Sequence, residues 1–270
     1  MPQPSHCKKA AAVAFFVEKV SASFVSVLTP NAKSGLKIPA EIDNLFNMDD
    51  LCLDFSGNNS GGKPAVISAE EILSKNSYRD FKIALAGSNC RLCALSGSRT
   101  RIVADRGSDK AKILVIGEAP GATEDKEGKA FVGRAGKTFD KVMASIGLDT
   151  NRDMLICNVV KCRPPGNRRP KEEEAKACRR FLLRQIEFIR PKAIILLGAT
   201  AFRHICAGTK KFSMGEEAGK FFNSQEFPGI SFMVMYHPAA LLYNVKLKPA
   251  MEEHAAKLKT FMEGENIFRA

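Results

Sequence analysis

Four short apolar runs lie between residues 112 and 236, and a glycine or a polar segment follows each of them. They occupy residues 112–116, 155–160, 193–197 and 232–236. Each run has the length of a strand, and a nearly continuous apolar run is typical of a strand that is buried on both faces. The pattern therefore predicts a parallel sheet of four strands.

Segments with helical periodicity separate or follow these strands. They cover residues 137–146, 171–189, 200–207 and 250–263. The second has the clearest start, because Pro170 precedes it and three glutamates occupy its first turn, at the positive end of the helix dipole. Alternating strands and helices predict an α/β fold, here a three-layer α/β/α sandwich with helices on both faces of the sheet.

Residues 1–85 do not follow this alternation, and we expect them to form an N-terminal extension of unknown role before a domain at 86–270. Within the extension, the pattern predicts an amphipathic helix at 10–28. Residues 56–62 have the composition of a flexible linker. A short helix is predicted at 67–75, with Ser68 as its N-cap.

The loops after the predicted strands carry the unusual residues. Residues 117–136 read GEAPGATEDKEGKAFVGRAG, and their five glycines let the backbone approach a ligand closely. Phe131 has little core to join there and could stack on a flat ligand. The fourth strand leads into His237, which is either structural or a ligand contact. Because the carboxyl ends of parallel strands meet at one edge, we expect a single site.

Charge and cysteine content narrow the class of protein. The formal net charge is +12, which suits a polyanion such as nucleic acid, although a basic surface alone gives the same excess. No apolar run approaches the ~20 residues that span a bilayer. The apolar run at 10–17 resembles a weak signal peptide, but Glu18 and Lys19 interrupt it. We expect a cytoplasmic monomer with no membrane segment, in which cysteines are metal ligands or plain thiols.

Four of the eight cysteines have the spacing of a metal site. Cys90 and Cys93 form a C-x2-C pair, and Cys162 and Cys178 come from later segments. Four thiolates suit tetrahedral zinc or an iron–sulfur cluster, and spacing alone puts zinc slightly ahead. Cys157 lies inside a predicted strand and is expected to be a core thiol.

Residues 161–171 read KCRPPGNRRPK, with five cations, three prolines and no acid. This segment is either a stiff solvated loop or a rim that contacts phosphates, and its place between two candidate metal ligands favours the rim. Leu241 and Leu242, in another basic context, are either core residues or a wedge for a DNA duplex. The GRAGKT stretch at 133–138 is not a phosphate-binding P-loop, because Phe131 stands where that motif needs a glycine.

Three of these segments, with the four cysteines, resemble the family 4 uracil-DNA glycosylases, the iron–sulfur members of the uracil-DNA glycosylase superfamily. The segments are GEAPGATEDKEGKAFVGRAG, NVVKCRPPGNRRP and HPAALL, and the resemblance covers about residues 86–262. It implies a [4Fe–4S] cluster rather than zinc, held by Cys90, Cys93, Cys162 and Cys178, with a structural role. It also implies hydrolysis of the N-glycosidic bond of deoxyuridine in single- or double-stranded DNA, which leaves an abasic site.

The resemblance also implies a role for each motif residue. Phe131 would stack on a flipped uracil, Asn158 would contact its polar edge, and His237 would donate to the base oxygen that gains charge. Glu118 would position water, Glu124 or Asp125 would wall the side where thymine carries its methyl group, and Gly117 and Asn167 would complete the pocket. The residues expected to contact DNA are Arg134, Arg163, Arg168, Arg169, Leu241, Leu242 and Lys246.

Some positions depart from related patterns. Family 1 enzymes have an aspartate where this chain has Ala119, so the residue that activates water is open between Glu118 and others. Residues 161–171 are short and lack a histidine, so we predict no covalent trapping of DNA. Tyr243 replaces a basic residue, whose phosphate contact Lys246 could supply. The alternatives are a non-catalytic DNA-binding module on the same fold and a hydrolase of free modified nucleotides.

Overall fold

The computed structural model describes residues 67–206 and 212–267. The chain divides into two compact units, Met1–Gly62 and Lys63–Ala270, and the described residues all belong to the second. The helix predicted at 10–28 and the linker predicted at 56–62 lie outside the described residues.

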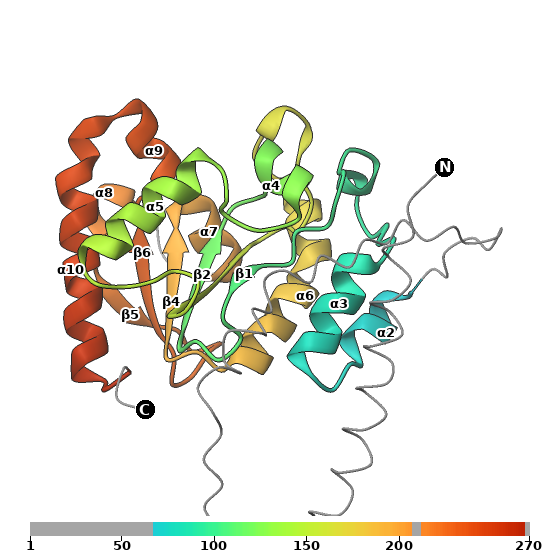
Figure 1. The fold of residues 1–270 in the computed structure, drawn as a ribbon, viewed down its shortest axis with the longest axis horizontal. Coiled ribbons are helices and arrows are strands. Elements are labelled where there is room, and N and C mark those ends of the chain that lie inside the picture. The colour runs from blue at the N-terminus through green and yellow to red at the C-terminus, as the bar shows by residue number, and fades with distance from the viewer. Residues whose placement is uncertain (1–66, 207–211, 268–270) are drawn as a thin grey trace, which may run out of the picture. The chain divides into compact units, whose positions relative to one another are not determined.

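A mixed sheet of six strands forms the centre of the described unit, in the order β1-β3-β2-β4-β6-β5 (Figure 1). The strands are β1 Arg106–Gly107, β2 Ile113–Gly117, β3 Met154–Asn158, β4 Ala193–Leu197, β5 Phe221–Asn223 and β6 Ser231–Met235. The four predicted strands are confirmed as the parallel centre, and β1 and β5 pair antiparallel at the edges. The edge strands have two and three residues, too few to show a periodic pattern.

The helices of the described residues agree with the predicted ones where a long periodic segment exists. The α-helices are α2 Ala69–Leu73, α3 Tyr78–Gly87, α4 Ala122–Glu127, α5 Arg134–Ser145, α6 Glu172–Ile189, α7 Gly198–Ile205, α8 Met214–Glu217, α9 Pro238–Tyr243 and α10 Lys248–Gly264. Three short 3₁₀ helices are η1 Ala94–Gly97, η2 Pro165–Asn167 and η3 Val245–Leu247. Ser68 caps α2 as predicted, accepting a hydrogen bond from the Glu71 amide at 3.1 Å. None of the described helices is long and apolar enough to cross a membrane.

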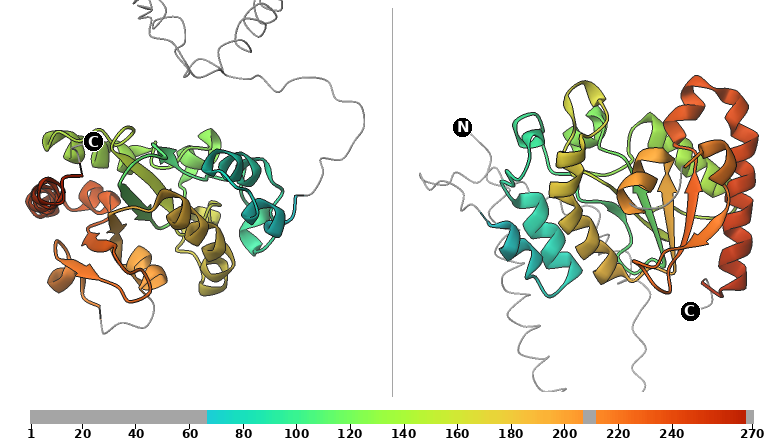
Figure 2. Two further views of the ribbon diagram at one scale, coloured as in Figure 1. Left: turned by 90° about the horizontal axis from the view of Figure 1, so that it is seen from below. Right: turned by 180° about the vertical axis from the view of Figure 1, so that it is seen from behind.

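Helices cover both faces of the sheet, which gives the three layers that the pattern predicts (Figure 2). Successive side chains of a strand point to opposite faces. Leu114 and Ile116 of β2 pack into a core with α2, α3, α6 and α7, whereas Ile113 and Val115 pack into a second core with α5, α9 and α10. Both cores are closed to solvent, so the sheet is a rigid platform for the loops at its edge.

Helices α2 and α3 belong to the same unit as the sheet, upstream of the boundary expected at residue 86. Ile72, Phe81 and Leu85 are at most 1% exposed and lie in the core on the α6 face. The rings of Tyr78 and Phe81 lie 5.9 and 5.7 Å from the ring of Phe188 on α6. The compact unit begins at Lys63 because this pair of helices completes one face of the domain.

The order of the strands brings the carboxyl ends of β2, β3, β4 and β6 to one edge. Within the sheet, β3 pairs with one edge of β2 and β4 pairs with the other edge. The chain therefore reverses the direction in which it adds strands between β3 and β4. Such a reversal opens a crevice beyond the strand ends, where ligands bind in open α/β sheets. Gly117 and Asn158 are in register at this edge, as the last pair of β2 and β3.

We predict that a chain beginning at Lys63 folds like the full-length protein, whereas one beginning at residue 86 does not. Removing α2 and α3 would expose the core face of α6, and even Phe81→Ala should lower the free energy of unfolding by about 3–5 kcal/mol. Thermal and urea unfolding followed by circular dichroism would measure the difference. Equal stability of the two truncated chains would contradict this assignment.

Candidate active site

A cavity of about 640 Å³ lies at the carboxyl edge of the parallel strands, where four loops meet. The loop after β2, the end of β3, the loop after β3 and the start of α9 all contribute to its wall. The lining includes Glu118, Glu124, Phe131, Arg134, Asn158, Asn167, Arg168, His237, Leu242 and Tyr243. The structure thus brings together the three motifs that the sequence places at separate strand ends.

Phe131 is held in the cavity wall by two glycines. An added Cβ at Gly117 would lie 2.5 Å from the Phe131 ring, and one at Gly136 would lie 1.7 Å from the Phe131 carbonyl oxygen. Phe131 itself has a positive φ of 54°, a conformation that is rare for a residue with a side chain. The expectation that its ring has little core to join was wrong, because Phe131 is 5% exposed and packs 6.3 Å from the ring of Phe139.

Asn158 presents an unpaired amide to this cavity. The residue ends β3 and is 1% exposed. Among the described residues, neither its side-chain oxygen nor its side-chain nitrogen has a hydrogen-bond partner. A buried polar atom without a partner costs about 1–3 kcal/mol. The amide can therefore gain a donor and an acceptor contact from a ligand that enters the cavity.

His237 faces the same space from the N-cap position of α9. Its Nδ1 accepts a hydrogen bond from the Ala239 amide at 3.2 Å, so a neutral ring carries its proton on Nε2. Burial lowers the pKa of His237, and the nearby Glu118 and Glu124 carboxylates only partly oppose this shift. The ring lies 5.8 Å from the Phe131 ring, so a neutral N–H donor stands beside the aromatic wall.

Three of the acids between β2 and α5 were predicted as site residues, and they have different environments. Glu118 lines the cavity. Glu124 also lines it, and its carboxylate accepts hydrogen bonds from the amides of Gly121 at 3.1 Å and Gly133 at 2.7 Å. Asp125 was predicted as an alternative wall residue, but it is 3% exposed, lies outside the cavity lining and accepts from the Thr100 and Arg101 amides at 2.8 and 3.3 Å. Asp125 anchors α4 to the segment before β1.

The basic segment after β3 has both internal and outward-facing cations. Arg168 forms a two-point ion pair with the buried Glu174, at 2.7 and 2.9 Å, so it holds the segment to the start of α6 as well as lining the cavity. Arg163 donates to the side-chain oxygen of Asn167 at 2.8 Å. Lys161 is 1% exposed and does not belong to the predicted phosphate-contacting rim.

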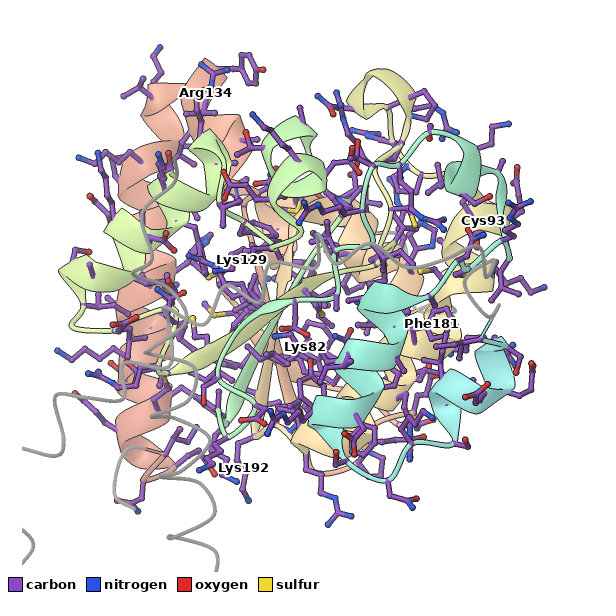
Figure 3. All side chains as sticks on the ribbon, turned by 45° about the vertical axis from the view of Figure 1, so that its right-hand side comes forward. Lys82, Cys93, Lys129, Arg134, Phe181 and Lys192 are labelled. Atoms are coloured by element: carbon purple, nitrogen blue, oxygen red, sulfur yellow. The ribbon has the colours of Figure 1, made fainter. Side chains whose placement is uncertain are left out.

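Three exposed cations lie on or next to segments that line the cavity. Arg134 begins α5, lines the cavity and is exposed at its rim (Figure 3). Arg169 and Lys246 are exposed on the two neighbouring loops. Their positions are compatible with a negatively charged ligand that is larger than the cavity.

The two leucines of HPAALL have separate environments. Leu241 is 9% exposed and packs into the core with α5 and α10, which supports the core alternative for this residue. Leu242 is 39% exposed and lines the cavity, and the adjacent Tyr243 and Val245 are 84% and 72% exposed. An apolar tip therefore stands beside the cavity mouth.

The four spaced cysteines line one small cavity of about 20 Å³ beside α6, together with Phe181. Figure 3 shows Cys93 near the helix that carries Phe181. All four are free thiols, with Arg99 and the Lys161 amide donating to the sulfurs of Cys162 and Cys178 at 3.6 and 3.4 Å. Burial raises the pKa of Cys162 to about 12 and that of Cys178 to about 11.

Two further observations bear on the cysteines. Cys157 is fully buried within β3, as predicted for a core thiol. Across residues 67–206 and 212–267, no three His, Cys, Asp or Glu side chains are grouped closely enough to hold a single metal ion. The structure thus confirms that the four spaced cysteines meet.

Comparisons with known proteins agree with this geometry. The family model of the uracil DNA glycosylase superfamily matches residues 104–259. A type-4 uracil-DNA glycosylase of Saccharolobus solfataricus is 42% identical over 182 residues, which cover 66% of this chain and 84% of the relative. Those of Thermotoga maritima and Archaeoglobus fulgidus are 41% and 39% identical, over 65% and 63% of this chain and 91% and 86% of the relatives.

The family model covers more than half of the chain, and the relatives match over most of their own length. The chain therefore belongs to the uracil-DNA glycosylase superfamily, and within it to the type-4 group.

We predict that His237 titrates below its ordinary pKa of 6.5 and that its neutral ring is protonated on Nε2. Since the unfolded chain binds this proton at a higher pH than the folded chain, the contribution of His237 to stability is present above pH ~6.5 and is lost on acidification. Nitrogen-15 NMR of labelled histidine would give both the midpoint and the tautomer. A midpoint at or above 6.5, or a proton on Nδ1, would contradict the prediction.

Proposed function

We propose that the chain hydrolyses the N-glycosidic bond of deoxyuridine in DNA, releasing uracil and leaving an abasic site. The observation that carries this proposal is the meeting of three groups in one cavity: an aromatic face on Phe131, an unpaired amide on Asn158 and a neutral N–H donor on His237. Uracil has a flat ring, and its polar edge offers both donors and acceptors. The cavity supplies a complement to each feature.

The target nucleotide must leave the base stack to reach this cavity. Once inside, uracil would stack on Phe131 while the Asn158 amide donates to one edge atom and accepts from its neighbour. Cytosine presents the opposite order of donor and acceptor at that edge, so an amide held in one orientation would favour uracil. Burial of the amide strengthens these contacts and the discrimination that they give.

The reaction leaves negative charge on the departing uracil and positive charge on the sugar. We assign to His237 a hydrogen bond from Nε2–H to the base oxygen where negative charge accumulates. A neutral imidazole is sufficient for this role, and the lowered pKa of His237 keeps the ring neutral. Glu118, on the cavity wall, would position the water that attacks the sugar.

The remaining wall residues would exclude thymine. Glu124 is fixed by two backbone amides, so its side chain cannot move aside for a methyl group at low cost. Gly117 has no side chain and lets Phe131 and Asn158 approach each other. Asn167 would add a second polar contact from the loop after β3.

Contacts outside the cavity would hold the DNA. Arg134, Arg163, Arg169 and Lys246 would contact phosphates, while Arg168 would mainly fix the shape of the rim through Glu174. Leu242 would enter the duplex where the flipped base was stacked. Binding by this route should weaken as the salt concentration rises, because phosphate contacts release counterions.

The four spaced cysteines would hold a [4Fe–4S] cluster. Four thiolates are the usual ligand set of such a cluster, and the four spaced cysteines line one cavity. The bound cluster would cross-link the segments that carry its ligands. The chain's own contribution is to bring the C-x2-C turn, the segment after β3 and α6 together and so to orient the basic segment between Cys162 and Cys178.

We predict that Asn158→Ala lowers kcat for uracil release by about 10²–10³-fold, the usual cost of removing one preorganised contact to the reacting group. The measurement is alkaline cleavage of a uracil-containing oligonucleotide after incubation with the protein. Asn223→Ala, on the exposed edge strand β5, is the matched control and should retain the wild-type rate.

Three outcomes would overturn the proposed function. The first is a wild-type protein that leaves every uracil intact in single- and double-stranded DNA. The second is that His237→Ala changes nothing while Arg169→Ala abolishes binding, as expected of a non-catalytic DNA-binding module. The third is cleavage of free deoxyuridine nucleotides without any dependence on salt, as expected of a nucleotide hydrolase.

We also predict that Cys162→Ser loses the brown colour and most of the iron of the purified protein, because a hydroxyl is a poor ligand for iron–sulfur clusters. Cys157→Ser, in the core outside the ligand set, should keep both. Visible absorbance and metal analysis test this pair. A colourless wild-type protein that contains one zinc ion would refute the cluster assignment.

A further inference from the structure

Lys161 is a buried lysine that neither the reaction nor the DNA contacts explain. It follows β3 by three residues and is 1% exposed. None of the ion pairs within the described residues includes it. Its side-chain nitrogen instead donates to the main-chain oxygen of Asn158 at 2.8 Å and to the side-chain oxygen of Gln185. Burying an amine is costly unless such acceptors surround it.

A chain of buried hydrogen bonds supports these two acceptors. Gln185 of α6 donates to the Tyr78 hydroxyl at 3.1 Å, and that hydroxyl donates to Asp105 at 2.8 Å. Lys82 pairs with the other oxygen of Asp105 at 2.6 Å. Figure 3 shows Lys82 on α3, between that helix and the sheet. The network therefore joins α3, which precedes the stretch matched by the family model, to the end of β3.

The main chain of Lys161 is fixed as firmly as its side chain. Its amide donates to the Cys178 sulfur at 3.4 Å, and its carbonyl accepts from the Val103 amide at 2.8 Å. By contrast, the side chain of Asn158 has no partner of its own among the described residues. The direction of the Asn158 amide therefore depends on its backbone, and Lys161 holds the carbonyl of that same residue.

We propose that Lys161 is a positioning residue for the Asn158 amide, with Gln185 and Tyr78 holding the lysine in place. The proposal rests on the proposed function, in which Asn158 contacts the polar edge of uracil. Lys161 orients the peptide plane that follows Asn158 and touches neither the base nor the DNA. Losing this contact would misplace the amide, and a misplacement of about 1 Å can cost about 10²-fold in rate.

The first test compares Lys161→Met with Lys192→Met in the full-length protein. Methionine keeps the length of the side chain and removes the donor, and Lys192 is an exposed control. Lys161→Met should lower kcat for uracil release about 10- to 100-fold, leave KM for the DNA within about twofold, and shift the side-chain amide NMR signals of Asn158. Lys192→Met should change none of these.

The second test is a double-mutant cycle with Asn158→Ala. In a chain that has already lost the Asn158 amide, Lys161→Met should reduce kcat no further, because the group that it positions is absent. A merely structural lysine would lower kcat by the same factor in both backgrounds. Equal losses in the two backgrounds, or unchanged Asn158 signals in Lys161→Met, would overturn the proposal.

Two provisions keep the tests decisive. If Lys161→Met does not fold, Tyr78→Phe is the milder variant, because it removes only one hydroxyl from the network. Tyr78→Phe should still shift the Asn158 signals and lower kcat. Unchanged signals and an unchanged kcat would overturn the proposal. The NMR signals need no turnover. A wild-type protein with no activity would therefore refute the proposed function, whereas a shift of the Asn158 signals in Lys161→Met would still support the positioning role.

Discussion

The close approach of β2 and β3 at their carboxyl ends is the constraint on which the rest of the site depends. Gly117 and Asn158 are paired there, and an added Cβ at Gly117 would lie within 2.6 Å of both the Phe131 ring and the Asn158 side-chain oxygen. Only a residue without a side chain lets the ring and the amide share one cavity wall. The glycine therefore contributes to function through the space that it leaves.

Two features of the site lower the stability of the folded protein. Asn158 is buried without a partner, and Phe131 has a left-handed backbone. Each costs on the order of 1–3 kcal/mol, and each persists because two closed cores and the Lys161 network over-determine the surrounding chain. Because the cavity is already formed in the folded protein, its side chains do not have to be ordered when a ligand binds, and binding is correspondingly stronger. Burial in the same surroundings lowers the pKa of His237 despite the nearby Glu118 and Glu124 carboxylates.

The sequence predicts the features that depend on local pattern, and it fails where partners come from distant segments. The apolar runs locate the parallel strands, and parallel strand ends converge whatever their loops contain. By contrast, Leu241 and Leu242 are adjacent leucines of the short helix α9. Leu241 lies on the side of the helix that faces the core, whereas Leu242 lines the cavity. Asp125 and Lys161 look like surface charges in the sequence, yet both are buried. Each forms a hydrogen bond with a residue that lies 24 or 25 positions away in the chain. No local pattern contains that information.

Helix α9 also has a geometric consequence. It is six residues long, His237 is its N-cap and Leu242 lies in its last turn. Leu241, between these two residues, packs into the core, so the helix holds His237 and Leu242 at a fixed separation. For the proposed reaction, the site where Leu242 enters the duplex and the site where His237 donates its hydrogen bond are therefore set by one short helix. The distance from the vacated base stack to the leaving group is thus built into the length of α9.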